Sequence, residues 1–169
     1  MEQKIDILQD VVIRFSGDSG DGMQLTGTLF SETSALAGNA ISTFPDYPAE
    51  IRAPQGTVAG VSGFQVHFGS QGVNNPGDAC DILVAMNPAA LKANRRFVKP
   101  NATIIVDADT FTPDNLTKAE FTTDNPVEEL GLGGYNVALV RITIFICMNM
   151  ESHFQFSLFI FKKCIVSWT

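Results

Sequence analysis

The segment from Asp10 to Gly27, DVVIRFSGDSGDGMQLTG, has the residue types of a loop that holds an anion. A β-branched run ends at Phe15, a short loop rich in glycine and aspartate follows, and a helical pattern begins at Met23. In α/β proteins such a loop lets the backbone turn tightly and approach a ligand, while the first free N–H groups of the helix point at it. The candidate ligand-binding residues of this loop are Gly17, Asp18, Ser19, Gly20, Asp21 and Gly22.

The spacing of these glycines, Gly17-x-x-Gly20-x-Gly22, differs from the two common phosphate-binding patterns. It is not the dinucleotide fingerprint G-x-G-x-x-G, and it is not a Walker loop, because no Lys-Ser/Thr pair follows the last glycine. Asp18 and Asp21 would repel a phosphate unless their side chains cap the helix or point away. Two interpretations therefore stay open, a ligand-binding loop and a tight strand-to-helix turn that is capped by Asp21.

Length and charge limit the classes of protein to which the chain can belong. The 169 residues suit one domain with a hydrophobic core of its own. The formal net charge of −7 disfavours nucleic acid and anionic membranes as partners, because their phosphates would be repelled. The N-terminal segment MEQKIDILQD lacks the basic and apolar regions of a signal peptide, so we expect a cytoplasmic protein.

Cysteine and histidine are too sparse to indicate a metal site. The three cysteines, Cys80, Cys147 and Cys164, form no C-x-x-C pair, and therefore no zinc or iron–sulfur site is predicted. An odd and sparse set of cysteines also fits a reducing compartment. His67 and His153 are far apart in sequence, and we interpret both as ordinary strand or surface residues.

Alternating strand and helix patterns predict an α/β fold, in which a layered, mostly parallel sheet has flanking helices. Strands are expected at residues 11–15, 41–44, 58–68, 80–85, 103–106 and 135–140. Helices are expected at residues 23–37 and 88–97, with a short helical turn at residues 126–130. The prolines within residues 45–56 predict a surface loop.

Signals at the helix ends place the loops between these elements. Asn87 followed by Pro88 is typical of a helix N-terminus, and Gly38 is typical of a helix C-terminus. Because ligands of parallel sheets bind outside the carboxyl ends of the strands, we expect the loops at Gly17, Asn87 and Asp107 to share one edge. The helical spacing of the first helix predicts a buried face made of Leu25, Leu29, Phe30, Thr33, Leu36 and Ala37.

Three segments of the chain together resemble one enzyme family. They are RFSGDSGDGMQLTG (14–27), TFPDYPAEIRAPQG (43–56) and CDILVAMNPAAL (80–91). Their order and spacing are similar to those of the gamma domain of 2-oxoacid:ferredoxin oxidoreductases, in particular the domain that opens the alpha subunit of the 2-oxoglutarate:ferredoxin type. The resemblance runs from about residue 11 to residue 140, and the second segment carries most of it, because that segment is long and unusual in composition.

The resemblance implies a division of labour within a larger enzyme. Enzymes of this family decarboxylate a 2-oxoacid on thiamine diphosphate, pass electrons through iron–sulfur clusters to ferredoxin, and release an acyl-CoA. The gamma domain is associated with CoA, whereas thiamine diphosphate, magnesium and the iron–sulfur clusters are expected elsewhere in the complex. Its expected partners are the thiamine-binding domain and the beta subunit, and ferredoxin through the complex. We therefore expect 2-oxoglutarate as the oxoacid, and no oxidoreductase activity from this chain alone.

Arg52 is the expected partner of a CoA phosphate outside the glycine loop. Its planar guanidinium group fits a phosphate, and the surrounding loop is otherwise short of positive charge. A surface salt bridge between Arg52 and either Glu50 or Asp46 is the alternative interpretation.

Further contacts with CoA are expected from Gln55, Gly56 and Asn87. Many relatives have a Gly-Gly pair after the arginine of the second segment. Here the sequence Ala53-Pro54-Gln55-Gly56 takes its place, so this loop departs from the family pattern.

The last segment differs in composition from the rest of the chain. Residues 142–169 contain no glycine, proline or aspartate, but they contain the only tryptophan and two of the three cysteines. We interpret residues 1–140 as an incomplete gamma domain and residues 141–169 as a non-native tail, produced by a shifted reading frame or a truncated gene. A buried final pair of strands is the alternative. The phenylalanines that crowd into this segment are Phe145, Phe154, Phe156, Phe159 and Phe161.

Three functions follow from these observations. The first is a CoA-associated, non-catalytic domain of an oxidoreductase subunit, the second is a free-standing nucleotide- or CoA-binding module, and the third is an inactive truncated remnant. A neighbouring gene for a thiamine-binding beta subunit would favour the first function over the second.

A non-native tail predicts poor expression or aggregation of the chain, because it would leave apolar surface of the sheet uncovered. Binding of the dye ANS measures this exposed surface, and replacement of residues 141–169 by a family-like ending should recover a soluble domain. A monomeric chain that unfolds cooperatively, and whose tail amides resist hydrogen exchange as well as those of residues 11–15, would contradict the prediction.

Overall fold

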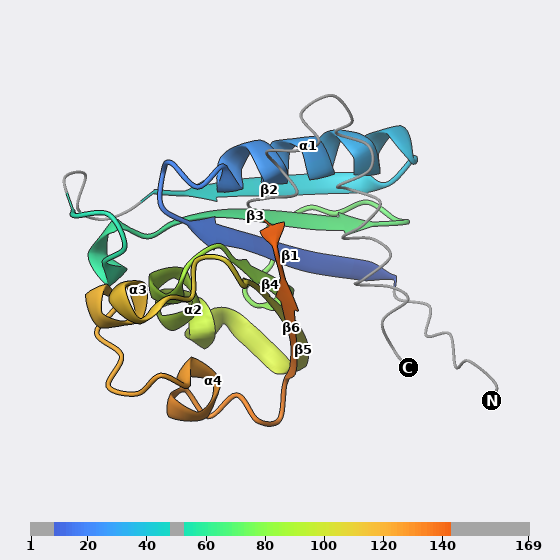
Figure 1. The fold of residues 1–169 in the computed structure, drawn as a ribbon. Helices are drawn as coiled ribbons and strands as arrows, with labels where there is room; N and C mark the ends of the chain where they lie inside the picture. Colours follow the sequence, from blue (N-terminus) through green and yellow to red (C-terminus); the bar gives the residue numbers. More distant parts are fainter. Residues whose placement is uncertain (1–8, 48–52, 143–169) are drawn as a thin grey trace.

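A single sheet with the strand order β2-β3-β1-β4-β5-β6 forms the centre of the molecule (Figure 1). The computed structural model describes residues 9–47 and 53–142. Strands β1, β4, β5 and β6 are parallel to their neighbours in this group, whereas β3 is antiparallel to both β1 and β2. The predicted α/β class with a mostly parallel sheet is confirmed. The strands are β1 (Asp10–Gly17), β2 (Ala40–Asp46), β3 (Ser62–Gly69), β4 (Cys80–Ala85), β5 (Val98–Asp107) and β6 (Asn136–Val140).

Helices cover both faces of this sheet. Figure 1 shows α1 on one face, and α2, α3 and α4 on the other. This arrangement agrees with two separate clusters of buried side chains, one beneath α1 and one beneath α2. The helical elements are α1 (Met23–Leu36), η1 (Val58–Gly60), α2 (Pro88–Asn94), η2 (Arg95–Phe97), α3 (Pro113–Lys118) and α4 (Pro126–Glu129), of which η1 and η2 are short 3-10 turns.

Strand β1 contributes side chains to both clusters, as β4 and β5 also do. Ile13 and Phe15 point into the cluster beneath α1, whereas Val12 points into the opposite one. A strand that is buried on both faces needs apolar residues in succession, which explains the run Val11-Val12-Ile13. Phe30 of α1 packs on Phe15, with 5.9 Å between the ring centroids. The glycine loop therefore begins at the end of a strand that is buried on both faces.

The prediction for the buried face of α1 is wrong in part. Leu25 and Leu36 are exposed by 54% and 87%, although both were expected to be buried. At Gly27 the helix lies close to β3, because a Cβ atom there would be 2.3 Å from Cδ1 of Phe64. Small residues thus let the helix approach the sheet, and the larger leucines turn outward. The residues of α1 that are buried are Met23, Thr26, Gly27, Phe30 and Ser34.

The C-terminus of α1 is confirmed at Gly38. This glycine has a φ of 87°, and its N–H donates to the carbonyl of Ala35. The N–H of Asn39 donates to the carbonyl of Ser34 at 3.2 Å. Together these two bonds form a Schellman motif, which satisfies carbonyl groups at the end of the helix.

Two other segments differ from the sequence-based expectation. Residues 58–60 form the turn η1 rather than the start of a strand, because the N–H of Gly60 bonds back to the carbonyl of Thr57, and β3 begins only at Ser62. Helix α3 was not predicted, although Thr112 followed by Pro113 is an N-terminal signal of the same kind as Asn87 followed by Pro88.

Arg141 and Ile142 begin the segment that we interpret as a tail. Ile142 is buried, and its N–H donates to Oδ1 of Asp107 at 3.0 Å. Arg141 Nε donates to Oδ1 of Asp109 at 2.7 Å. Residues 143–169 lie outside the described part of the chain, so the interpretation of the tail stays a prediction. In the described ranges, no helix is long and apolar enough to cross a membrane.

The close approach of α1 to β3 predicts that Gly27→Ala destabilises the protein. In an open helix this change would stabilise by about 1 kcal/mol, but a clash with a packed ring costs about 1–3 kcal/mol. We expect urea unfolding to show a net loss. The double variant Gly27→Ala, Phe64→Leu should recover part of the lost stability, because leucine is smaller than the phenylalanine ring. If Gly27→Ala alone is as stable as the wild type, the helix does not pack against Phe64 in this way.

Candidate functional site

The loops that follow β1, β4 and β5 meet at one edge of the sheet, as the sequence predicts. The N–H of Met86, just after β4, donates to the carbonyl of Ser16 at 2.8 Å. The hydroxyl of Thr110, just after β5, donates to the carbonyl of Met86. These bonds bring the glycine loop, residues 17–22, next to Asn87 and to the loop that begins at Asp107. In Figure 1 this edge is where α3 and the turn η1 also lie.

Asp18 points into the protein and fastens the glycine loop to a second segment. Its Oδ2 accepts a hydrogen bond of 2.6 Å from the N–H of Gly56, and the residue is only 6% exposed. Its Oδ1 is buried and has no hydrogen-bond partner within the described part of the chain. The first and second segments of the resemblance are thereby joined directly at this carboxylate.

Asp21 also points inward, and the prediction that it caps α1 is wrong. Its Oδ2 accepts hydrogen bonds from the N–H of Asp18 at 2.9 Å and from Nδ2 of Asn87 at 2.8 Å. The N-cap of α1 is instead Gly22, which has a φ of 77° and offers no side chain to the helix. The left-handed turn at Gly22 carries Asp21 away from the axis of α1, and the amide of Asn87 binds it.

Asn87 uses both ends of its side chain within the protein. Its Oδ1 accepts a hydrogen bond from the N–H of Ala90 at 2.8 Å, which confirms it as the N-cap of α2. Its Nδ2 donates to Asp21, and the residue is buried. Asn87 thus holds the glycine loop against α2 through both ends of its amide.

Four of the predicted site residues form the outer surface of this edge, which we call the rim: Ser19, Gly20, Gln55 and Gly56. Ser19, Gly20 and Gln55 are exposed. A Cβ atom at Gly20 would lie 3.8 Å from Nε2 of Gln55, and among the described residues it would meet no other group within 4 Å. Gly56 has a φ of 83°, which favours glycine. The rim is therefore small, polar and accessible to a ligand.

Gly17 has a different role from the rest of the loop. A Cβ atom there would lie 2.9 Å from Oδ2 of Asp21 and 2.9 Å from Cβ of Met86. Glycine at this position lets the strand end pass close to both residues. Its function is packing of the loop against β4.

Arg52 lies outside the described residues, so its contact with a phosphate stays a prediction. Asp46, one of its two alternative partners, forms an ion pair with Arg14 of β1. Arg14 is buried, and its Nε donates to Oδ1 of Asn94 at 2.6 Å while Nη1 donates to Oε1 of Gln65 at 3.2 Å. A buried arginine inside an apolar strand gave no recognisable sequence signal, because its partners are far away in the chain.

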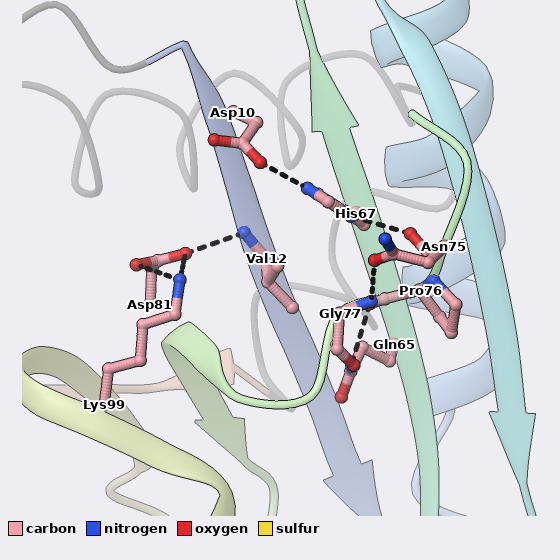
Figure 2. A network of polar contacts seen from close by, with 9 residues as sticks. All are labelled: Asp10, Val12, Gln65, His67, Asn75, Pro76, Gly77, Asp81 and Lys99. Atoms are coloured by element: carbon pink, nitrogen blue, oxygen red, sulfur yellow. Dashed lines mark hydrogen bonds and ion pairs between the residues drawn. The ribbon is translucent and has the colours of Figure 1, made fainter. Parts of the chain in front are cut away.

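A second polar network lies at the opposite edge of the sheet (Figure 2). His67 bonds through Nε2 to Oδ2 of Asp10 and through Nδ1 to the carbonyl of Asn75, both at 2.7 Å. Gln65 Nε2 donates to the carbonyls of Pro76 and Gly77. These contacts hold residues 70–77 across β3, so His67 is a structural residue, as the sequence suggested.

Metal and thiol chemistry find no support in the described ranges. No group of three or more His, Cys, Asp or Glu side chains there is arranged to hold a metal ion. Burial raises the pKa of the Cys80 thiol to about 11, so this cysteine is protonated and unreactive at neutral pH. Cys147, Cys164 and His153 lie outside the described residues.

Electrostatics at the glycine loop are dominated by its two aspartates. Burial raises the pKa of Asp18 above its usual value of 3.8, and the nearby charge of Asp21 raises it further. Hydrogen bonds from the N–H of Gly56 and from Asn87 act in the opposite direction. The loop thus holds a carboxylate whose charge is disfavoured by its surroundings.

Comparisons with known proteins agree with this fold. The family described as pyruvate ferredoxin/flavodoxin oxidoreductase matches residues 12–149, and this match covers most of the chain. The chain therefore belongs to that family. It is also 53% identical, over 136 residues, to the 2-oxoglutarate oxidoreductase subunit KorA of Mycobacterium tuberculosis. This alignment covers 80% of the chain but only 21% of that subunit, so the chain spans about a fifth of its curated relative's length.

Solved structures support the same fold. A 2-oxoglutarate:ferredoxin oxidoreductase from Magnetococcus marinus aligns with a TM-score of 0.61 and 22% identity, over 90% of this chain and 23% of that one. The gamma subunit of a keto/oxoacid ferredoxin oxidoreductase from Geobacter sulfurreducens aligns with a TM-score of 0.54 and 22% identity, over 85% of this chain and 66% of that one. At these identities the likeness concerns the fold alone.

The raised pKa of Asp18 predicts that Asp18→Asn stabilises the protein at neutral pH. An acid whose pKa is higher in the folded state contributes stability below its unfolded pKa, and this contribution is lost as the pH rises through the folded pKa. Asparagine carries no charge and keeps an oxygen for the N–H of Gly56.

Urea unfolding of the wild-type protein and of Asp18→Asn, followed from neutral pH down to acidic pH, measures the difference in their free energies of unfolding. The advantage of Asp18→Asn should be largest at neutral pH and should shrink as the pH falls towards 3.8, the usual value for an aspartate. Asp124→Asn, at an exposed position, serves as the control. A variant that is less stable at neutral pH, or a difference independent of pH, would show that the buried charge is not the cause.

Proposed function

We propose that this chain is the CoA-associated gamma domain of a 2-oxoacid:ferredoxin oxidoreductase subunit. In this function it supports oxidative decarboxylation of a 2-oxoacid to its acyl-CoA, with electrons passing to ferredoxin. Membership in the pyruvate ferredoxin/flavodoxin oxidoreductase family supports the class of enzyme. The 53% identity to a 2-oxoglutarate oxidoreductase subunit supports 2-oxoglutarate as the oxoacid, and it favours an enzyme subunit over a free-standing binding module.

The inward orientation of the two loop aspartates is the observation that carries the proposal. Oδ2 of Asp18 and Oδ2 of Asp21 accept hydrogen bonds from N–H and amide groups of the protein itself, so these two oxygens are turned towards the protein. The rim that remains outside offers backbone and small polar groups to a ligand. In addition, no side chain caps the N-terminus of α1, and its first N–H groups carry the positive end of the helix dipole.

CoA fits this surface in chemical terms. Its phosphates are anions that suit a helix N-terminus and a glycine loop, and its pantetheine arm carries amides that bond to groups such as the side chain of Gln55. Gly20 lets a ligand reach the backbone, because no side chain stands there. The Magnetococcus marinus enzyme that shares this fold was solved with coenzyme A, 2-oxoglutarate and succinyl-CoA bound, which supports the choice of ligand.

The chemistry of decarboxylation belongs to other parts of the complex in this proposal. We assign thiamine diphosphate and its magnesium to the thiamine-binding domain and the beta subunit, as the resemblance to the family implies. This chain's own contribution is to bind and orient CoA beside that active site, and it performs no bond-breaking step.

Gly20→Leu tests this proposal more cleanly than a change at Gly22. The new side chain would fill the open space above the rim, whereas Gly22 has a φ of 77° and any substitution there would strain the backbone. We expect KM for CoA in the assembled enzyme to rise by roughly ten-fold or more, with little change in KM for the oxoacid.

Gly72→Leu is the matched control, because it also meets open space but lies in the loop after β3. It should leave both KM values unchanged. If Gly20→Leu alters both KM values equally, or neither of them, the glycine loop is only a structural turn and the proposal fails.

A further inference from the structure

Lys118, the last residue of α3, brings a positive charge to the rim from a distant part of the sequence. We propose that the ammonium group of Lys118 binds a phosphate group of the ligand at the rim, so that α3 completes the binding site. The inference rests on the proposed function, since it requires a phosphorylated ligand such as CoA. Lys118 was not among the predicted site residues, because helix α3 itself was not predicted.

The position of Lys118 is set by packing against Gly56. Its Cδ and Cβ atoms lie 3.4 Å and 3.7 Å from the place that a Cβ atom of Gly56 would occupy. The N–H of Gly56 is in turn bonded to Asp18 of the glycine loop. The apolar stem of Lys118 therefore lies against the rim. Lys118 is exposed, so its ammonium group has access to solvent.

Helix α3 is held firmly enough to position this side chain. Its N-cap is Thr112, whose hydroxyl accepts from the N–H of Asn115. Leu116 is buried in a cluster with Ala89 of α2 and with Phe121. The partly buried Val58 of η1 packs against the same cluster, so α3 and the segment that carries Gly56 share one core.

A role for Lys118 in neutralising the dipole of α3 is the simpler explanation, but another lysine already has that role. Lys92 Nζ donates to the carbonyls of Ala119 and Glu120 at 3.0 Å and 2.6 Å, directly after the helix. The stem of Lys118 instead lies against Gly56, which belongs to the rim. This contact brings the side chain within reach of a group that is bound at the rim.

Several other described cations are engaged with partners away from the rim. Arg14 pairs with Asp46, Lys99 with Asp81, and Arg141 with Asp109. A phosphate that approaches the rim also meets the field of Asp18 and Asp21, which is repulsive when both are ionised. A cation at Lys118 offsets this repulsion and gives the rim a preference for an anionic group.

The test uses the assembled oxidoreductase with the variants Lys118→Ala and Lys118→Arg. Lys118→Ala should raise KM for CoA by roughly two- to five-fold, the range expected from loss of one partly exposed ion pair, without a matching change in kcat or in KM for the oxoacid. Lys118→Arg should restore most of the affinity, because it keeps the charge. Lys99→Ala, a lysine paired with Asp81 outside the site, should have no effect.

Repeating the measurement with 3′-dephospho-CoA identifies which phosphate is bound. If the effect of Lys118→Ala disappears, the lysine binds the 3′-phosphate, and if it persists, the lysine binds the pyrophosphate; both results support the inference.

If Gly20→Leu raises KM for CoA while Lys118→Ala does not, CoA binds at the rim without Lys118 and this inference is wrong. If Lys118→Ala changes both KM values equally, its role is structural and the inference again fails. If neither Gly20→Leu nor Lys118→Ala changes KM for CoA, both the proposed function and the inference about Lys118 are wrong.

Discussion

The hydrogen bond from the N–H of Gly56 to the buried carboxylate of Asp18 is the contact on which the candidate site depends. It joins two segments that are 38 residues apart and fixes Gln55 beside Gly20. Burial of a carboxylate next to a second carboxylate is unfavourable unless each one receives hydrogen bonds. Here the two aspartates share donors from the glycine loop, from Gly56 and from Asn87, and the same bonds fix the shape of the loop.

This constraint separates the residues that hold the site from those that face a ligand. Asp18, Asp21 and Asn87 are turned inward and connect β1, β4 and α2 into one rigid edge. The residues left outside are small or polar and do not block the approach of a ligand to the backbone. An edge of this kind suits the proposed role, in which the domain positions CoA for chemistry performed elsewhere.

The sequence predicted those features that are determined locally. Strand β1, the C-terminus of α1 at Gly38 and the N-cap at Asn87 each follow from a few adjacent residues. Features set by tertiary packing were missed. The buried face of α1 depends on the contact between Gly27 and Phe64, and the direction of Asp21 depends on the distant amide of Asn87. Buried Arg14 and the position of Lys118 against Gly56 likewise rest on contacts that no local pattern encodes.

Hydrogen–deuterium exchange of the assembled enzyme, with and without saturating CoA, tests the central claim most directly. CoA at the rim must cover backbone amides there, so exchange should slow in peptides that contain residues 17–22 and 53–57. Peptides that cover residues 70–77, at the opposite edge of the sheet, should exchange at the same rate in both states. Unchanged exchange at residues 17–22 and 53–57, under conditions where CoA is bound to the complex, would contradict the account.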